Sequence, residues 1–557
     1  MRPVGRLQYW IIPLAYALLL ALTKSVNVGD TRWYARQIVS YAKGDSGAGG
    51  NQLWEFGHLI WRPLGYLLYR TVHWFTGGVL GWSDYLTART SLVAISVICG
   101  LLLALTIASL ATQVSGSWGV GLVTAVLLVY GNAFLTMAPA GSSYIPGLLF
   151  LTLALRISVA GRPSALWMGV SLGLAVTLWF PYVLSIPGAV LAAFCWNRSE
   201  WRFRGPETRQ RLRLLLVTLL ITGAVIAVLY GAGILALGLH SPGDFGRWVR
   251  ESQHGWTQNR TALRLVSGLP RAFISMGQDT ILFKRFALHD PYAPVTIVSL
   301  VFSSLWKLLL FYGAMFCLIL ALVRRGENSA IAIVAAGALP VLAFALYFES
   351  GSLERFLALY PFLALSLAVV LAFRPIAWAA RVLLLFLIIA GVSNVYDAWR
   401  PRVERQVEQE LSRASSIQRA ARGGQVWLMS LSDPLYWAVD ALPFENQGGR
   451  RELRLDPVAQ IGTESVAHWR LGFARLTLDA WDSGKPVWMS KRLLSSRPRP
   501  EWGWTEGDDP RVSWQALTTF ARGLATDREA GGEDGFVRLA DTPANRHMLA
   551  IIEAGSG

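Results

Sequence analysis

The chain has 557 residues, of which 53% are hydrophobic and 15% are charged. This length exceeds that of one ordinary soluble domain, and the composition lies outside the globular range, so the sequence predicts a polytopic membrane protein with a soluble part. The formal net charge of +16 does not indicate nucleic acid as a partner, because much of the arginine excess lies beside apolar segments, where it meets lipid headgroups.

Motifs that bind common cofactors are absent from the sequence. It contains no Walker-type phosphate loop, no GxGxxG after a predicted strand, no CxxC pair and no HExxH. Cys99, Cys195 and Cys317 lie inside apolar runs, so we interpret them as small packing residues rather than as a disulfide framework or a metal site.

Long apolar runs recur along the first 395 residues. A helix needs about 20 apolar residues to cross the bilayer hydrocarbon, since lipid offers no partner to backbone polar groups. In one region the motif "LWFPYVLSIPG" predicts either a tight re-entrant turn between two short spans or a proline kink inside one long helix. About eleven spans are predicted, near residues 8–23, 87–112, 118–136, 143–160, 164–179, 181–196, 212–238, 293–322, 328–347, 355–373 and 376–395.

Arginine-rich short loops predict the orientation of these spans. The loop "NRSEWRFRGPETRQRLR" holds six arginines and falls on the same side as Arg2 and Arg6, which precede the first span. Basic loops face the cytoplasm, so the loops 24–86 and 239–292 and everything after residue 396 are predicted to lie outside an inner (cytoplasmic) membrane. The first apolar segment also fits a cleaved signal peptide, which would remove one helix and leave the orientation unchanged.

The composition changes near residue 396. A transmembrane domain is predicted for residues 1–395, a charged helical linker for residues 396–424 and a small α/β domain for residues 425–557. In the last of these, "QVWLMSL", "KPVWMSKRLL" and "GFVRLA" indicate short strands, while "ESVAHWRLGFARLTLDAWDSG" and "WQALTTFARGLATD" indicate helices.

The first external loop carries polar residues close to the membrane edge. Asp30, in "VGDTRWYARQ", follows the first span by a few residues. The motif "NQLWEFGHLIWRP" predicts a helix that Pro63 ends or kinks, and which has either its polar face in water at the interface or a polar stripe lining a cavity beside Asp30. The residues of that stripe are Asn51, Glu55, His58 and Arg62.

Basic residues also lie at the edges of two later spans. Arg355, in "FESGSLERFLALYPFLAL", is predicted in the first turn of a transmembrane helix, where the helix dipole disfavours a cation. The compensating anion is either a carboxylate, Glu349 or Glu354, or a phosphate at the membrane surface. In "FKRFALHDPY", Lys284 and Arg285 are either interfacial anchors or ligand contacts.

These residues together suit the transfer of a group from a lipid-linked phosphate. The acceptor hydroxyl needs a general base, and the leaving phosphate needs fixed positive charge. We assign Asp30 to the first role. The second role falls to Arg62, Arg355 or Lys284.

Three segments resemble the GT-C superfamily of integral-membrane glycosyltransferases, which take sugars from polyprenyl-phosphate carriers. "VGDTRWYARQI" is similar to its acidic motif in the first external loop, "GHLIWRPLGYLLYR" to its following juxtamembrane segment, and "ERFLALYPFLAL" to its Glu-Arg-aromatic run. The resemblance implies a polyprenyl-phosphate-sugar donor, a glycan, lipid or protein acceptor, and inversion at the sugar carbon. It also implies a base or metal-ligand role for Asp30. The candidate donor-phosphate or substrate-binding residues are Arg355, Arg62, His58, Glu55, Glu354, Lys284 and Arg285.

The chain departs from the superfamily pattern in two places. Many members carry an Asp-Glu pair where this chain has Asp30 and Thr31. A second carboxylate must therefore come from Glu55 or Asp84 or be absent. One carboxylate alone is a poor site for a divalent metal, so a metal is possible but not required. The Trp-Trp-Asp motif of oligosaccharyltransferases is missing from the C-terminal domain, which argues against transfer to asparagine sequons.

A transporter or flippase for a lipid-linked or anionic substrate is the alternative function. Such a protein is expected to hold ionisable residues at mid-membrane and paired discontinuous helices. Most charges of this chain instead lie at span edges, and the spans show no obvious halves, which favours the enzyme.

Overall fold

The structure is a computed structural model. In it the chain forms two compact units. The first unit comprises Met1–Gly277 and Phe302–Pro401, and the second comprises Gln278–Val301 and Arg402–Gly557. The residues that the structure describes are 10–22, 29–44, 53–196, 206–252, 262–276, 296–348, 352–372, 377–403, 426–428, 466–494, 519–527 and 536–554.

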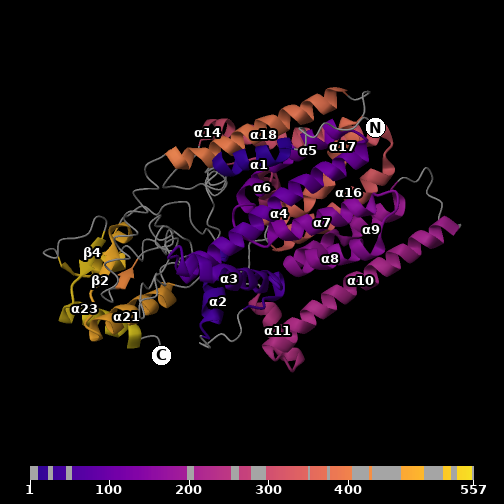
Figure 1. The fold of residues 1–557 in the computed structure, drawn as a ribbon. Coiled ribbons are helices and arrows are strands. Elements are labelled where there is room, and N and C mark those ends of the chain that lie inside the picture. The colour runs from indigo at the N-terminus through magenta and orange to yellow at the C-terminus, as the bar shows by residue number, and fades with distance from the viewer. Residues whose placement is uncertain are drawn as a thin grey trace. The chain divides into compact units, whose positions relative to one another are not determined.

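The regular secondary structure in the described residues of the first unit is all helical (Figure 1). Three short 3-10 turns interrupt it: η2 (Phe56–His58), η3 (Phe180–Ser185) and η5 (Leu353–Leu359). Its α-helices are α1 (Ile11–Leu22), α2 (Gly29–Ala42), α3 (Trp61–Gly78), α4 (Asp84–Ser115), α5 (Trp118–Val129), α6 (Asn132–Met137), α7 (Tyr144–Ser158), α8 (Ala165–Leu178), α9 (Ile186–Cys195), α10 (Pro206–Leu237), α11 (Pro242–Glu251), α12 (Ala262–Arg271), α15 (Trp306–Arg325), α16 (Asn328–Phe348), α17 (Tyr360–Leu371) and α18 (Ala377–Val403).

Six helices are long and apolar enough to cross a membrane, and five shorter apolar helices accompany them in the described residues. Together they overlap every predicted span. The number of membrane crossings remains a prediction, because each of the shorter helices has fewer residues than the roughly 20 that one crossing needs. The six long segments are Asp84–Ser115, Glu207–Leu237, Trp306–Arg325, Asn328–Phe348, Leu353–Leu371 and Trp378–Asp397.

The chain breaks between α8 and α9, so the interpretation of "LWFPYVLSIPG" as one kinked helix is wrong. The re-entrant turn between two short spans stays a prediction. Helix α8 ends at Leu178, and Trp179 is extended, with φ −148° and ψ 107°. Pro181 then lies in the first turn of η3 and Pro187 in the first turn of α9. Proline is tolerated there because the N–H that it lacks has no intrahelical acceptor.

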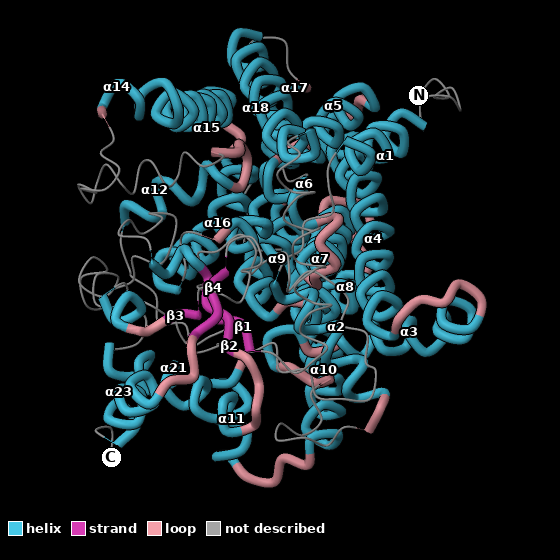
Figure 2. The backbone as a smooth tube through the Cα atoms, turned by 90° about the vertical axis from the view of Figure 1, so that its left-hand side faces the viewer, coloured by secondary structure: helices cyan, strands magenta, loops and turns pink. Residues whose placement is uncertain are grey.

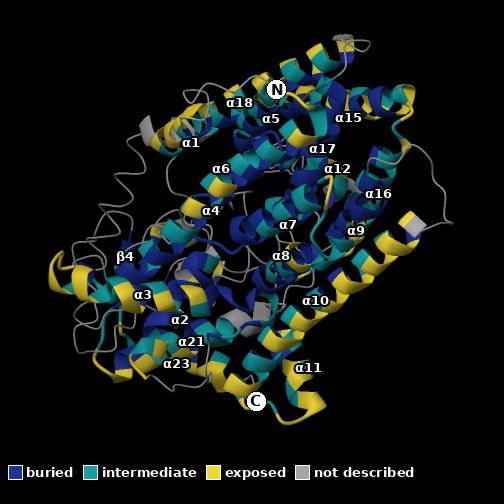
Figure 3. Cartoon of the chain, turned by 45° about the vertical axis from the view of Figure 1, so that its right-hand side comes forward, coloured by how far each residue is buried: buried dark blue, intermediate teal, exposed yellow. Residues whose placement is uncertain are grey.

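Helices α4, α7 and α8 form the centre of the first unit, and α10 packs along α8 (Figure 1). Helix α7 is almost wholly buried, whereas α10 exposes much of its surface (Figure 3). A Cβ at Gly169 would lie 2.8 Å from Thr218 O, and one at Gly173 would lie 2.6 Å from Val225 Cγ1. Small residues on α8 therefore permit the close approach of α10, as is usual between helices in lipid.

The second unit contains a four-stranded sheet, drawn in magenta in Figure 2, with strand order β1-β2-β4-β3. β1 and β2 are parallel, with α21 in the connection between them, and the other two pairs are antiparallel. This confirms the predicted strands at β1, β2 and β4 and the predicted helix at α21. Its elements are β1 (Val426–Leu428), α21 (Val466–Asp482), β2 (Val487–Ser490), η9 (Lys491–Leu494), β3 (Thr526–Asp527), β4 (Phe536–Leu539), α23 (Pro543–Ala554) and the short α14 (Ile297–Leu300).

Two predicted segments differ in extent from the structure. The helix predicted over residues 514–527 is helical at 519–523, and its last two residues pair as β3. The predicted linker 396–424 is described only as far as Val403, where it continues α18. The rest of the linker lies outside the described residues.

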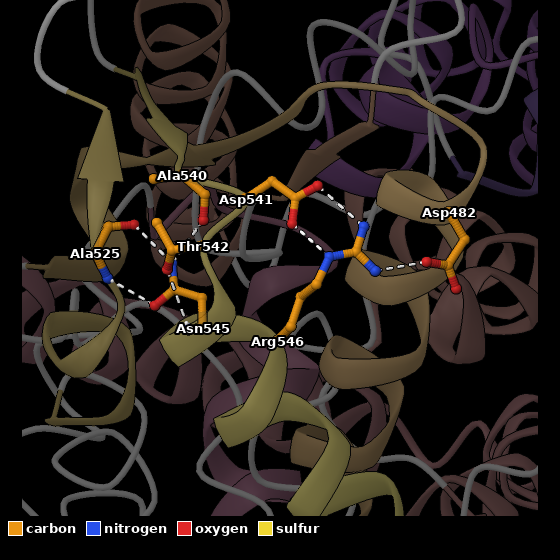
Figure 4. Close-up of polar contacts among 7 residues, drawn as sticks. All are labelled: Asp482, Ala525, Ala540, Asp541, Thr542, Asn545 and Arg546. Carbon is orange, nitrogen blue, oxygen red and sulfur yellow. Dashed lines mark hydrogen bonds and ion pairs between the residues drawn. The ribbon is translucent and has the colours of Figure 1, made fainter.

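Side chains of α23 bind this helix to its neighbours (Figure 4). The Asn545 side chain accepts a hydrogen bond from Ala525 N at 3.0 Å and donates to Ala540 O at 2.7 Å. Arg546 donates to both carboxylate oxygens of Asp541, at 2.5 and 2.9 Å, and to Asp482 at 2.6 Å. These contacts join α23 to the sheet and to α21.

The crossing of α9 and α16 provides a test of the packing. We expect Gly188→Ala to destabilise the protein by about 1–3 kcal/mol, because the new Cβ would lie 2.6 Å from Phe362 Cε1 and 2.7 Å from Gly337 Cα. Gly223→Ala on α10 is the matched control, since nothing lies within 4 Å of its Cβ. Thermal midpoints in detergent that are equal for the two variants would contradict the packing described.

Candidate functional site

Asp30 lies in the first turn of α2, where the helix dipole stabilises an anion. Its side chain is partly buried, and the Tyr144 hydroxyl donates a hydrogen bond to Asp30 Oδ2 at 3.1 Å. The next residue, Thr31, is buried and donates to Ala140 O at 2.5 Å. Ala140 lies between α6 and α7 and Tyr144 is the first residue of α7, so residues far apart in the sequence hold the start of α2.

The helix predicted over residues 51–62 is wrong in its described part. Glu55 is extended, with φ −106° and ψ 133°, and only the short turn η2 separates it from α3, which begins at Trp61. Pro63 does not end or kink a helix. It lies in the first turn of α3, which continues to Gly78, because a proline costs no hydrogen bond there. Asn51 lies outside the described residues.

Tertiary hydrogen bonds explain why this segment is not helical. Trp54 O accepts a hydrogen bond from Trp248 Nε1 at 3.0 Å. Phe56 N donates to Ser252 Oγ at 3.0 Å, and Phe56 O accepts from the Tyr230 hydroxyl at 2.8 Å. Backbone groups that a helix would pair internally are therefore paired with α10 and α11.

Three of the predicted stripe residues still come together, by a different geometry. Arg62 Nη2 donates to Glu55 Oε2, and both side chains are buried. The Arg62 guanidinium also lies over the rings of Trp33, at 4.0 Å, and Tyr34, at 5.0 Å. Arg62, at the start of α3, therefore contacts α2 through these two rings and the segment before η2 through its buried ion pair with Glu55.

His58 is buried between α2 and α7. Its Nδ1 and Ser143 Oγ are hydrogen-bonded at 2.6 Å, and its ring packs edge-on against Tyr34 and Tyr144. Burial lowers the pKa of His58 below its ordinary value, although the carboxylates of Glu55 and Asp30 oppose the shift. Burial likewise raises the pKa of Tyr34 well above 10. Both groups are therefore neutral near pH 7, and His58 contributes hydrogen bonds rather than a positive charge.

Arg355 lies in the 3-10 turn η5, ahead of α17, rather than in the first turn of an α-helix as predicted. Its guanidinium is 4.9 Å from the ring centroid of Phe348 and 5.8 Å from that of Trp179. The Trp179 ring packs edge-on against Tyr144, with centroids 5.2 Å apart. Tyr144 and Trp179 thus connect Asp30, at the start of α2, with Arg355.

The long loop predicted over residues 239–292 contributes a further basic residue, Arg271, at the end of α12. Burial lowers the pKa of Arg271, and the carboxylate of Glu354 opposes that shift, which places Glu354 in the electrostatic environment of Arg271. The neighbouring segment is held in place by Asn394 of α18, which accepts from Ser275 N at 2.5 Å and donates to Phe273 O at 2.9 Å. The Phe273 ring stacks on Tyr360, the residue that follows η5.

The two carboxylates proposed as partners for Asp30 have other contacts. Glu55 binds Arg62, and Asp84 binds Lys43 at 3.0 Å and His73 at 2.7 Å. Within the described ranges, no group of three His, Cys, Asp or Glu side chains is arranged to hold a metal ion.

Several candidate residues were missed or cannot be placed. Ser143 and Tyr144 belong to the motif "APAGSSY", whose polar residues at a span edge are the signal in the sequence for a contact with the first loop. The positions of Trp179 and Arg271 follow only from the folded chain. Lys284, Arg285 and Glu349 lie outside the described residues.

Solved structures of ArnT from Cupriavidus metallidurans resemble the chain. The apo structure is 12% identical, with TM-score 0.52 and coverage of 97% of this chain and 98% of that chain. The structure bound to undecaprenyl phosphate is 11% identical, with TM-score 0.51 and the same coverage. The Archaeoglobus fulgidus oligosaccharyltransferase in its apo form is 14% identical, with TM-score 0.47, over 92% of this chain and 73% of that chain. No protein-family model and no curated protein matches the sequence.

The likeness to ArnT concerns the fold, and it covers nearly the whole length of both chains. The chain therefore has the fold of ArnT, which agrees with the GT-C fold that the sequence resemblance predicts. That fold is a polytopic helical membrane protein, here with a small C-terminal sheet domain.

The buried ion pair yields a prediction about stability. Glu55→Met is expected to lower the free energy of unfolding by about 3–5 kcal/mol, because it leaves the Arg62 cation buried without its carboxylate. The double variant Glu55→Met/Arg62→Met should recover most of the thermal midpoint measured in detergent. A single variant that melts with the wild type would show that the pair does not hold the loop.

Protonation of His58 yields a second prediction. Because burial keeps the pKa of folded His58 below 6.5, the unfolded chain binds more protons than the folded chain just below that pH. The contribution of His58 to stability is therefore present above pH 6.5 and is lost as the pH falls from 6.5 through the folded pKa. His58→Gln should flatten the fall in thermal midpoint over this window. His240→Gln, at an exposed position, is the control and should reproduce the wild-type slope.

Proposed function

We propose that this protein is a membrane glycosyltransferase that passes a sugar from a polyprenyl-phosphate donor to a glycan, lipid or protein acceptor outside the cytoplasmic membrane. The observation that carries the proposal is the connection of the carboxylate Asp30 with the guanidinium Arg355 through Tyr144 and Trp179. The GT-C fold supports it, as does the binding of undecaprenyl phosphate by the structural neighbour ArnT.

The donor phosphate is assigned to Arg355 and Arg271. A guanidinium matches phosphate oxygens with two parallel N–H donors and stays charged at any working pH. The aromatic rings of Trp179, Phe344 and Phe348 surround the Arg355 guanidinium, which limits its motion. A cation held in this way stabilises the charge that grows on the phosphate as it leaves the sugar. Glu354, Lys284 and Arg285 remain candidates for the same site.

Asp30 is assigned the role of general base. It accepts the proton of the acceptor hydroxyl while that oxygen attacks the anomeric carbon from the face opposite the phosphate. The bond between the sugar carbon and the phosphate oxygen breaks, the carrier leaves as polyprenyl phosphate, and the sugar carbon is inverted. This route forms no covalent link between sugar and protein. Glu55, His58 and Arg62 act as the buried scaffold that supports α2, because their charges and hydrogen bonds are directed to one another and to α7.

Helix α3 suits a position at the outer surface of the membrane. Its buried face holds Arg62 and Tyr69, while its other face exposes Leu67, Trp74 and Phe75 to the surroundings. An exposed apolar face that includes tryptophan is typical of helices that lie in the bilayer interface. This arrangement would keep the site at the depth of a lipid-linked phosphate.

The role of Asp30 can be tested with purified full-length protein in lipid nanodiscs. The donors are undecaprenyl phosphates carrying a hexose, a pentose or an amino sugar, and the acceptors are extracted envelope glycans and lipids. Release of undecaprenyl phosphate and incorporation of the sugar are measured together. Asp30→Asn is expected to lower the rate about 10²–10⁴-fold, the usual contribution of a positioned base.

Asp482→Asn is the matched control for this experiment. Its carboxylate is largely exposed in the second unit, where it contacts Arg546, so the rate should match that of the wild type. An Asp30→Asn protein with full activity would rule out the proposed base. A wild-type protein that moves donors across the bilayer without releasing undecaprenyl phosphate would favour transport instead.

A further inference from the structure

The turn between α6 and α7 has unusual burial for a polar segment. Its sequence is "APAGSSY", residues 138–144, and all seven residues are buried. Buried polar groups need partners in the protein, since each one left without a hydrogen bond costs about 1–3 kcal/mol. The partners of this turn identify what the turn is built to hold.

Three hydrogen bonds connect the turn to the first external loop. Ala140 O accepts from the Thr31 hydroxyl at 2.5 Å. Ser143 Oγ is bonded to His58 Nδ1 at 2.6 Å. The Tyr144 hydroxyl donates to Asp30 Oδ2 at 3.1 Å. Two of the three reach consecutive residues, so the turn holds both the carboxylate and the backbone that carries it.

Gly141 permits this close contact. Its φ is +72°, in the left-handed region, and a Cβ there would lie 2.9 Å from Thr31 Cγ2 and 3.1 Å from Val93 N. No other residue fits without moving the start of α2 or the backbone of α4. The turn therefore packs directly against Thr31.

The ring of Tyr144 has little freedom to move its hydroxyl. The backbone carbonyl of Tyr144 accepts a hydrogen bond from the buried Tyr182 hydroxyl at 2.7 Å. Its ring is packed edge-on by His58 on one side and by Trp179 on another, with centroid distances of 5.5 and 5.2 Å. A donor held in this way fixes one oxygen of the Asp30 carboxylate.

We infer that Tyr144 and Thr31 are positioning residues that orient Asp30 for proton transfer, an inference that rests on the proposed function. With Oδ2 held by Tyr144, the carboxylate cannot rotate freely, and Oδ1 is the oxygen that receives the proton from the acceptor hydroxyl. The proton leaves the acceptor oxygen as that oxygen bonds to the sugar carbon, and the electron pair of the broken bond stays on the phosphate. A misplacement of about 1 Å in such a group can cost about 100-fold in rate.

This inference also explains the threonine that follows Asp30. Where many members of the superfamily carry a second acid, this chain uses the hydroxyl of Thr31 to bind the turn. A carboxylate at that position would face the carbonyl oxygen of Ala140, which cannot donate a hydrogen bond to it.

The test uses the nanodisc assay and the undecaprenyl-phosphate sugar that the wild type turns over fastest. Tyr144→Phe removes only the hydroxyl, and it should lower kcat about 10–100-fold while the KM for the donor stays within about twofold. Thr31→Val should lower kcat similarly, and Thr31→Ser, which keeps the hydroxyl, should restore it. Tyr16→Phe is the control, because it removes a buried hydroxyl bonded to Val97 O and should leave kcat unchanged.

The outcomes separate this inference from the proposed function. If the wild type releases no undecaprenyl phosphate from any donor, the proposed function fails. If Asp30→Asn stays active, the proposed base is wrong, and the positioning inference fails with it. If Asp30→Asn is inactive while Tyr144→Phe keeps the wild-type kcat, the positioning role is wrong and the function stands. A rise in KM with constant kcat would assign Tyr144 to substrate binding and overturn the inference. So would a Thr31→Ser protein as slow as Thr31→Val, or a loss of kcat that matches a loss of thermal stability.

Discussion

The absence of hydrogen-bonding partners in lipid is the constraint on which this structure depends. Apolar helices satisfy it internally, and irregular segments that are buried in the protein, where water is also excluded, must find partners in neighbouring helices. The segment ahead of α3 does so through α10 and α11, the segment after α12 through Asn394 of α18, and the turn between α6 and α7 through α2 and η2. These irregular segments therefore have defined positions, and they carry the residues that we assign to chemistry.

The same constraint separates the charges of the site into two kinds. Glu55 and Arg62 are deeply buried and bind each other, so their main effect is on the position of α2 and the stability of the loop. Asp30 and Arg355 are far apart in the sequence of the first unit, and Tyr144 and Trp179 connect them in space. The roles proposed for these two residues require this separation, because a base and a phosphate-binding cation must each contact the substrate rather than each other.

Sequence patterns predicted the helices well and the site incompletely. The eleven predicted spans all overlap apolar helices, because a long apolar run has few stable conformations in lipid. The stripe formed by Glu55, His58 and Arg62 does gather near Asp30, but not on one helix face. Its backbone is paired with Trp248, Ser252 and Tyr230, and no local pattern contains that information. The prediction that Pro63 ends or kinks a helix was wrong for a related reason, since the effect of a proline depends on where the helix begins.

The sequence by itself determined that this is a polytopic helical membrane protein, and it located the apolar helices and the strands β1, β2 and β4. It also singled out Asp30 and Arg355 at the edges of predicted spans. These follow from composition, periodicity and residue chemistry within short windows. Only the tertiary structure decided which groups meet. Tyr144 reaches Asp30 across 114 residues, Arg271 shares its electrostatic environment with Glu354, and burial makes His58 a neutral hydrogen-bonding group. Proximity and burial depend on the packing of distant segments, and a local pattern carries neither.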